Sequence, residues 1–381
     1  MQIKSIEPIA ISIPMRKPVV MAGEEVRRAD NMLVRVIARD GSIGWGEAAS
    51  APTMTGETVA SMIAAVEHLT PVLEGREAGD IEGALVAMHG RMYGNHGAKA
   101  AIEIALHDLL GRATGKPIHA LLGDKRRARV GILGVIGGGD FDGDLHDAGK
   151  KKGEGFPAFK IKVGIDTPAR DAERTRAICK ILGTDGLISA DANQGFSRAE
   201  ALEYVKAVAG ASLAFFEQPV DADDLDAMAA VAAATDIAVG ADEGIHSLAD
   251  IERHHARGAA RGTSLKAIKL GGLRGLADAA RLCDQLGMNV NIACKTGETS
   301  IACAAALHVA AVIPGIAWAL TLTNGGLSAD VTPTPIRVEH GHTEVLDGPG
   351  LGIDVDESFV VRHRVGAGQS SPTLRTVAAA R

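Results

Sequence analysis

The chain has 381 residues, of which 46% are hydrophobic and 3% aromatic, and its formal net charge at pH 7 is −7. The isoelectric point is near 6.0 and charges of both signs are mixed throughout, so neither a nucleic acid nor a membrane is an expected partner. No apolar run reaches the length of a membrane span, and the N-terminus lacks the regions of a signal peptide. We therefore expect a cytoplasmic protein that handles small molecules, with a length that suits an α/β barrel plus one smaller unit.

Residues 1–125 predict the smaller unit, which combines strands and helices. Alternating apolar and polar residues favour strands, whereas apolar residues at helical spacing favour helices. Asp40-Gly41 is typical of a hairpin turn between two of the strands. We expect strands at residues 3–12, 32–38 and 44–48, and helices between residues 57 and 122.

A repeating pattern follows, and a strand expected at residues 130–136 begins it. Short apolar runs with a charged residue at one end alternate with stretches of helical spacing. Strands alternating with helices in this way predict parallel strands joined by right-handed crossovers, and enough of them close a barrel. The charged residues are Lys162, Asp191, Glu217, Asp242 and Lys266, at successive intervals of 29, 26, 25 and 24 residues. Helices are expected at residues 168–182, 198–208, 225–233, 248–256 and 276–286, and two last strands at 289–294 and 317–322.

These patterns divide the chain into a cap and a barrel. We place the barrel at residues 126–333 and expect about 334–365 to return to the cap. The composition of residues 366–381 predicts a flexible tail.

Two lysines of the repeat lie on one strand, on either side of Ile161. Lys160 and Lys162 therefore point to the same face. Two like charges on the inner face of a sheet should lower each other's pKa, which makes a lysine a usable base near neutral pH. The simpler interpretation is an exposed edge strand with solvated lysines.

The carboxylates of the repeat indicate a metal site. In a (β/α) barrel, functional side chains gather at the C-terminal ends of the strands, where all of them fall. Asp191, Glu217 and Asp242 offer the hard oxygen ligands that suit a magnesium ion with open positions for substrate oxygens. The alternative is three structural ion pairs with Lys160, Lys162 and Lys266. Lysines facing each other across a divalent cation predict removal of a proton next to a carboxylate.

Five short motifs, in this order and at these intervals, resemble the enolase superfamily in its muconate-lactonizing subgroup (the mandelate racemase/muconate lactonizing enzyme family). The similarity runs from residue 1 to about 360. The motifs are Lys160-Ile-Lys162, Asp191-Ala-Asn193, Glu217-Gln218-Pro219, Asp242-Glu243 and Lys266-x-x-Lys269-x-Gly271-Gly272. The resemblance implies a modified TIM (β/α) barrel with an N-terminal α+β capping domain that the C-terminal segment completes.

The same resemblance implies roles for individual residues. Asp191, Glu217 and Asp242 would bind Mg²⁺, for which Mn²⁺ can substitute. Lys162 and Lys266 would be the opposed acid/base pair, and Lys160 would assist them. Contacts with the substrate or with these groups are expected from Asn193, Glu243, Lys269, Glu298, Thr321, Thr323, Trp318 and Met54.

Some of these contacts have alternatives. Two loops, at residues 21–30 and 49–58, are expected to close over the barrel mouth, although Arg27 and Arg28 in the first are better explained as solvated charges. Lys295 can contact a substrate anion, but a solvated side chain is the better explanation. Glu298 would lie beside Lys266 and the substrate, or be only a partner of a lysine. The Trp318 ring can face a substituted ammonium group, with core packing as the simpler interpretation.

The predicted activity is Mg²⁺-dependent abstraction of a proton α to a carboxylate, through an enediolate. Racemisation or epimerisation of an amino-acid derivative, either N-substituted or of the proline betaine type, is the first expectation. A muconate-type cycloisomerase and a dehydratase of a β-hydroxy acid such as cis-3-hydroxyproline use the same parts. A barrel aldolase with a Schiff-base lysine is an alternative of another class, which the three aligned carboxylates argue against.

The eighth strand separates this chain from one group of relatives. Dipeptide epimerases of the subgroup carry Asp-x-Asp there, where this chain has Thr321-Leu322-Thr323. Dipeptide epimerisation is therefore not expected. The resemblance also implies a homo-oligomer, from dimer to octamer, and a small carboxylate as the binding partner.

Overall fold

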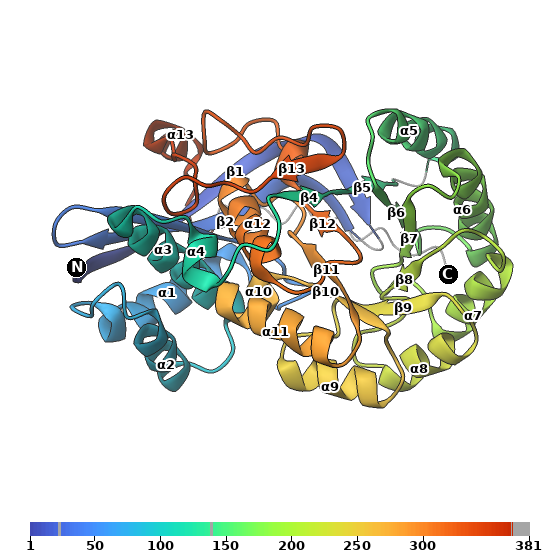
Figure 1. Cartoon of the computed structure of the whole chain (residues 1–381), viewed down its shortest axis with the longest axis horizontal. Helices are drawn as coiled ribbons and strands as arrows, with labels where there is room; N and C mark the ends of the chain where they lie inside the picture. Colours follow the sequence, from blue (N-terminus) through green and yellow to red (C-terminus); the bar gives the residue numbers. More distant parts are fainter. Residues whose placement is uncertain (22–23, 138–139, 367, 369–381) are drawn as a thin grey trace.

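A computed structural model describes residues 1–21, 24–137, 140–366 and 368 (Figure 1). The tail predicted at 366–381 lies, apart from residues 366 and 368, outside this range. No helix in the described part of the chain is both long and apolar enough to cross a membrane.

An antiparallel sheet of three strands opens the chain, in the order β1-β2-β3. The predicted turn at Asp40-Gly41 is confirmed, and Gly41 has the positive φ, +87°, that favours glycine. The first two strands pair from Ile3 as far as Met21, so most of the predicted 21–30 loop is instead strand. Backbone pairing satisfies the main-chain polar groups even where the side chains are too polar to signal a strand. The strands are β1 (Ile3–Met21), β2 (Glu24–Ala38) and β3 (Ile43–Ala49).

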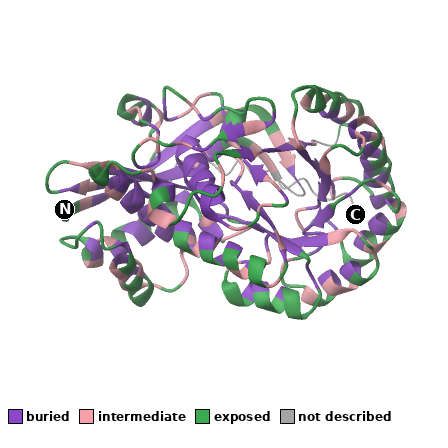
Figure 2. Ribbon diagram, viewed as in Figure 1, coloured by how far each residue is buried: buried purple, intermediate pink, exposed green. Residues whose placement is uncertain are grey.

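Four helices complete the N-terminal part, and one of them lies between the sheet and the barrel. This helix, α3, is buried along most of its length (Figure 2). It packs closely on β3 because Gly44 and Gly46 have no side chain there; a Cβ on Gly46 would fall 1.9 Å from the carbonyl oxygen of Ala101. The helices are α1 (Val59–Leu73), α2 (Ile81–Arg91), α3 (His96–Thr114) and α4 (Ile118–Leu122).

Eight parallel strands form the barrel predicted from the repeat. They follow the chain in the order β5 to β12, and a bridge between Ile132 and Leu320 joins the two edges of the sheet. The strands are β5 (Leu133–Ile136), β6 (Ala158–Lys162), β7 (Leu187–Asp191), β8 (Phe215–Glu217), β9 (Ala238–Ala241), β10 (Gly262–Leu265), β11 (Asn289–Ala293) and β12 (Leu320–Thr321). The expected strand at 317–322 is shorter than predicted because Ala319 has a φ of +60°, which extended backbone does not allow.

Helices surround the barrel, and four of them begin at the residue that the sequence predicted. They are α5 (Phe141–Gly153), α6 (Pro168–Leu182), α7 (Arg198–Ala207), α8 (Leu225–Ala233), α9 (Leu248–Ala256), α10 (Ala267–Leu270), α11 (Leu273–Gln285) and α12 (Ser300–Val312), with a 3-10 turn, η1, at Asn324–Gly326.

The C-terminal segment returns to the N-terminal sheet. Ile11 of β1 bridges to Arg364, next to α13 (Glu357–His363). The strand expected at 130–136 is divided: β4 (Arg129–Gly131) pairs with β13 (His342–Glu344), and only β5 joins the barrel. The fold class is therefore the predicted one, a barrel with an N-terminal cap that the C-terminal segment completes.

Two buried glutamates of the cap bind the N-termini of two barrel helices. Glu47 of β3 accepts hydrogen bonds from the backbone N–H groups of Thr299 and Ala302 at the start of α12. Glu103 of α3 accepts one from the N–H of Arg274 at the start of α11, at 3.1 Å. Unpaired N–H groups and the helix dipole both attract a carboxylate to such positions. Burial nevertheless raises the pKa of Glu47 and of Glu103 to about 7.

Replacing Glu103 by Gln should change how stability depends on pH. The folded pKa of Glu103 lies above its ordinary value of 4.5, so its contribution is complete below pH 4.5 and is lost as the pH rises through 7. The shift corresponds to about 3 kcal/mol. Denaturant unfolding from pH 5 to 8 should show Glu103→Gln gaining stability relative to wild type by up to that amount. The exposed Glu67→Gln serves as control, and parallel pH profiles for Glu103→Gln and wild type would contradict the assignment.

Candidate active site

A cavity of about 1310 Å³ opens at the C-terminal ends of the barrel strands. Met15, Val19 and Met21 of β1 line its cap side, together with Met54 from the 49–58 segment. Arg27 and Arg28 do not line it: Arg27 pairs with Glu25 and Arg28 donates to Ser12. The β1 end of the first hairpin, rather than the 24–30 side, therefore forms the wall of the cavity.

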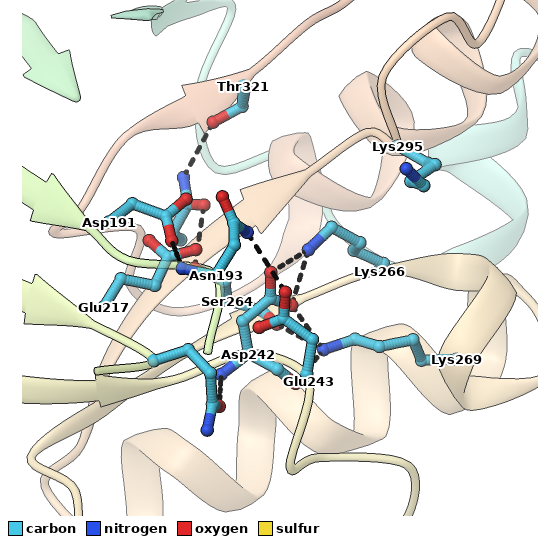
Figure 3. A network of polar contacts seen from close by, with 12 residues as sticks. Asp191, Asn193, Glu217, Asp242, Glu243, Ser264, Lys266, Lys269, Lys295 and Thr321 are labelled. Atoms are coloured by element: carbon cyan, nitrogen blue, oxygen red, sulfur yellow. Dashed lines mark hydrogen bonds and ion pairs between the residues drawn. The ribbon is translucent and has the colours of Figure 1, made fainter. Parts of the chain in front are cut away.

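Three carboxylates from neighbouring strands meet at the base of this cavity (Figure 3). Lys162 lies directly opposite Asp191 in the β6–β7 register, and Asp191 lies opposite Glu217 in the β7–β8 register. Asp242 follows β9. Since register partners stand at the same level of a parallel sheet, the period of the sequence is sufficient to bring these groups together.

Each carboxylate is paired with a lysine. Lys160 Nζ lies 2.6 Å from Glu217 Oε2, and Lys162 Nζ donates to Asp191 Oδ2 at 2.6 Å. Lys266 Nζ donates to both carboxylate oxygens of Asp242. The ion pairs considered as the alternative interpretation of the sequence are thus present.

The three carboxylates also have the chemistry of a magnesium site. In the described residues no group of three acidic, His or Cys side chains has the arrangement of a metal site as it stands. A lysine contacts each of the three carboxylates. However, Glu217 is only 1% exposed and neither of its oxygens accepts a well-directed hydrogen bond. A buried carboxylate with unused lone pairs, beside two further hard oxygen donors, fits a divalent cation that displaces the lysines.

The surrounding charges set the protonation of the site. Burial alone lowers the pKa of Lys160, but the charges of Glu217 and Asp191 outweigh it and the net pKa is raised. Burial opposes ionisation of Asp242 too, yet Lys266 and Lys269 hold its pKa far below the ordinary value. The expectation of a lowered pKa is therefore wrong for Lys160, because the neighbouring carboxylates raise its pKa by more than burial lowers it.

The motif residues next to these groups hold them in place. Lys269 is fully buried and its Nζ donates to Asp242 Oδ1 at 2.7 Å, so it supports the carboxylate and does not line the cavity. Asn193 bridges two groups: its Oδ1 accepts from Lys162 at 2.5 Å and its Nδ2 donates to Glu243 at 3.0 Å. Burial, followed by the charge of Asp242, raises the pKa of Glu243 to about 7.

The remaining predicted contacts divide between the cavity and the core. Thr321 and Thr323 line the cavity, and so does Lys295, which is buried and not solvated as expected. Glu298 lies behind Lys295, where it accepts the Lys295 N–H at 2.9 Å. The structure does not bring Trp318 to the site: its ring is buried and stacks on Phe215 inside the barrel, with centroids 3.9 Å apart.

The sequence analysis missed a residue that positions Asp242. Gln218 is fully buried with a φ of +33°, and its side-chain oxygen accepts the N–H groups of Asp242 at 2.9 Å and Gly244 at 3.3 Å. Its Nε2 donates to the Val220 carbonyl. A glutamine in the left-handed region stores strain of the kind found at functional sites. Its position directly after Glu217 was the available signal.

An arginine on α6 positions the end of β6 in a similar way. Arg174 is buried and its Nη2 donates to the carbonyl of Lys162 and to Asp171, both at 2.7 Å. Asp171 in turn accepts the Gly164 N–H at 2.7 Å. These hydrogen bonds therefore hold the loop that follows Lys162 in place.

Comparison with known proteins gives matches along nearly the whole chain. A family model described as "Mandelate racemase / muconate lactonizing enzyme, N-terminal domain" matches residues 6–123, and one described as "Enolase C-terminal domain-like" matches residues 145–359. A chloromuconate cycloisomerase of Pseudomonas putida is 30% identical, over 97% of this chain and 100% of that protein. An N-succinyl-L-Arg/Lys racemase of Bacillus cereus is 31% identical, over 94% and 96%.

A solved structure is similar in three dimensions as well. The dipeptide epimerase of Cytophaga hutchinsonii, in complex with Mg and the dipeptide D-Ala-L-Val, superposes with a TM-score of 0.89 at 28% identity, covering 95% of this chain and 98% of that one.

Gln218→Leu should destabilise the protein more than Gln194→Leu does. Both glutamines have positive φ, but Gln218 makes three hydrogen bonds to backbone groups, whereas Gln194 accepts one, from the Ala222 N–H. Leaving buried partners unpaired should cost about 3 kcal/mol at Gln218 and about 1 kcal/mol at Gln194. Unfolding in denaturant measures both values. Equal costs would show that Gln218 does not hold the Asp242 segment.

Proposed function

This chain belongs to the mandelate racemase/muconate lactonizing enzyme family of the enolase superfamily, and on that premise we propose that it racemises or epimerises an N-acylated amino acid. It is an isomerase of that superfamily. The proposed reaction removes the proton α to a carboxylate and returns it to the opposite face. The relationship to the Bacillus cereus racemase supports this choice of substrate.

One observation carries the proposal, namely the placement of two lysines around the barrel. Lys162 ends β6 and Lys266 follows β10. These strands are four places apart in a barrel of eight, so the two side chains approach the cavity from opposite sides. Between them, Asp191 ends β7, Glu217 ends β8 and Asp242 follows β9. An α-carbon held in the middle is then within reach of a lysine on each face.

The α-proton of a carboxylate is a very weak acid, so the developing negative charge has to be stabilised. Mg²⁺, when bound by Asp191, Glu217 and Asp242, would supply a fixed positive charge for this purpose.

The lysines carry the proton. The lysine that is neutral when substrate binds accepts it on one face, and the protonated lysine opposite donates one to the other face. Such general acid–base catalysis contributes roughly 10²- to 10⁴-fold, or about 3 to 5 kcal/mol. Lys160 has a raised pKa and so stays protonated, and we assign it the role of a fixed positive charge beside Glu217.

The cavity wall argues against two related substrates. A dipeptide carries an ammonium group, but the end of β12 offers Thr321 and Thr323, which are uncharged. A proline betaine would gain from an aromatic face, but Trp318 lies in the core. Muconate-type cycloisomerisation is a second candidate, because chloromuconate cycloisomerases match this chain as closely as the racemase does.

Lys162→Ala and Lys266→Ala should each abolish racemisation. Each variant lacks the lysine that serves one face of the substrate, so exchange of the α-proton in D₂O should persist at most for one enantiomer. The overall rate of racemisation should fall by at least about 10²-fold. Proton NMR of N-succinyl- and N-acetyl-amino acids with Mg²⁺ measures both effects. Lys150→Ala, on the exposed side of α5, is the control. Undiminished racemisation in either lysine variant would exclude the two-base mechanism.

Glu217→Gln should weaken Mg²⁺ binding and abolish activity, since it removes one of three anionic ligands. Titration calorimetry with Mg²⁺, and separately with Mn²⁺, measures the affinity directly. EDTA should stop turnover in wild type, and added Mg²⁺ should restore it. Glu200→Gln, at the start of α7, makes the same substitution away from the site and should bind Mg²⁺ with wild-type affinity. Wild-type Mg²⁺ affinity in Glu217→Gln would show that Glu217 is not a ligand of the metal.

A further inference from the structure

Lys269 is a fully buried lysine that ties the Asp242 segment to the start of α10 (Figure 3). Its Nζ donates to the backbone carbonyl of Asp242, to Asp242 Oδ1 at 2.7 Å and to the Ser264 carbonyl at 3.0 Å. An ammonium group has three N–H donors, so all of them are used. The position of the Asp242 carboxylate therefore depends on where the backbone of Lys269 lies.

A residue of the cap holds that backbone. Lys269 belongs to α10, which has only four residues, and a helix leaves its last carbonyl groups without partners inside the helix. The Lys269 carbonyl accepts a hydrogen bond from Nδ1 of His96, the first residue of α3, at 2.6 Å. Because a carbonyl can only accept, Nδ1 must carry the proton. His96 therefore joins the cap to the support of Asp242.

The same end of α3 is held by a buried glutamate. Asn95, at the N-cap position of α3, makes no side-chain capping hydrogen bond. Instead, Glu57 accepts the N–H groups of Gly97 at 2.9 Å and Ala98 at 3.3 Å, where the helix dipole also favours a negative charge. A Cβ on Gly97 would lie 3.0 Å from Glu57 Oε2, so the glycine leaves room for this carboxylate.

Glu57 belongs to the turn that carries Met54. The Glu57 carbonyl accepts the Ala51 N–H at 3.0 Å, and the Ala51 carbonyl accepts the N–H groups of Met54 at 3.0 Å and Thr55 at 2.8 Å. Met54 lines the cavity, whereas Glu57 and His96 do not. Hydrogen bonds thus run from the wall of the cavity through the start of α3 to the lysine that holds Asp242.

We propose that His96 and Glu57 are positioning residues, which fix the magnesium ligand Asp242 from the cap. The inference rests on the metal site of the proposed function and goes beyond it, because neither residue touches the metal or lines the cavity. His96 holds the Lys269 carbonyl, and Glu57 holds the end of the helix on which His96 lies. The affinity for Mg²⁺ then depends on hydrogen bonds within the cap.

Variants of His96 that keep or lose a donor at the place of Nδ1 test the first step. His96→Phe keeps a ring without the donor and should weaken Mg²⁺ binding about tenfold, as is typical of residues that orient metal ligands. The amide nitrogen of His96→Asn lies near the place of Nδ1, and that of His96→Gln lies further from the backbone. His96→Asn should therefore retain most of the affinity and His96→Gln should not. Titration calorimetry with Mg²⁺ measures the dissociation constants without turnover.

Glu57→Leu tests the second step. It should weaken Mg²⁺ binding roughly threefold in the wild-type background but less than about twofold in His96→Phe, because both residues act through one hydrogen bond. Asp80→Ala is the control, since it removes the N-cap of α2 elsewhere in the cap. It should lower stability to denaturant and leave the affinity for Mg²⁺ unchanged.

Four results would overturn the inference while leaving the proposed function in place. They are wild-type Mg²⁺ affinity in His96→Phe, equal affinities of His96→Asn and His96→Gln, additive effects of His96→Phe and Glu57→Leu, and a loss in Asp80→Ala as large as that in His96→Phe. The comparison of His96→Asn with His96→Gln decides the matter even where His96→Phe does not fold. Failure of the wild-type protein to bind Mg²⁺ would instead refute the metal site of the proposed function.

Discussion

Burial of charge at one end of the barrel is the constraint on which the rest of this structure depends. A cluster of eight ionisable side chains is buried there, all at most 8% exposed, and they are Lys160, Lys162, Lys266, Lys269, Asp191, Glu217, Asp242 and Glu243. An unpaired buried charge costs several kcal/mol, so these groups are stable only in mutual contact. The contacts in turn require the ends of β6 to β10 to stand at matching heights. Packing of the hydrophobic strands alone does not demand this, but the charges do.

A surrounding set of buried polar groups meets that requirement. Gln218 fixes the backbone at Asp242, and Arg174 fixes the carbonyl of Lys162. From the cap, Glu47 and Glu103 reach the N-termini of α12 and α11, the helices that follow the loops after β11 and β10. The two domains therefore share hydrogen bonds at the same barrel end that carries the site. Loss of one of these supports should disturb the cavity as well as stability.

The sequence predicted the barrel and its charged residues because two independent patterns, the short apolar runs and the charged residues at their ends, are both local. Each strand is a short apolar run, and each run carries its charged residue where a parallel barrel gathers side chains. Burial of Lys295 could not be predicted in this way, since it lies in the wall of a cavity that segments far apart in the chain build together. Trp318 lies outside the strand because the positive φ of Ala319 delays the start of β12 to Leu320, and its ring stacks on Phe215. Long-range packing and unusual backbone conformations decide such cases, and neither leaves a periodic pattern.

The return of the C-terminal segment to β1 has a consequence for how the chain folds as it is made. The partners Ile11 and Arg364 are separated by most of the polypeptide. At typical rates of synthesis, of about 5 to 20 residues per second, the second emerges from the ribosome roughly 20 to 70 s after the first. During that interval the outer edge of the N-terminal sheet lacks its native cover and presents unpaired backbone groups to other nascent chains.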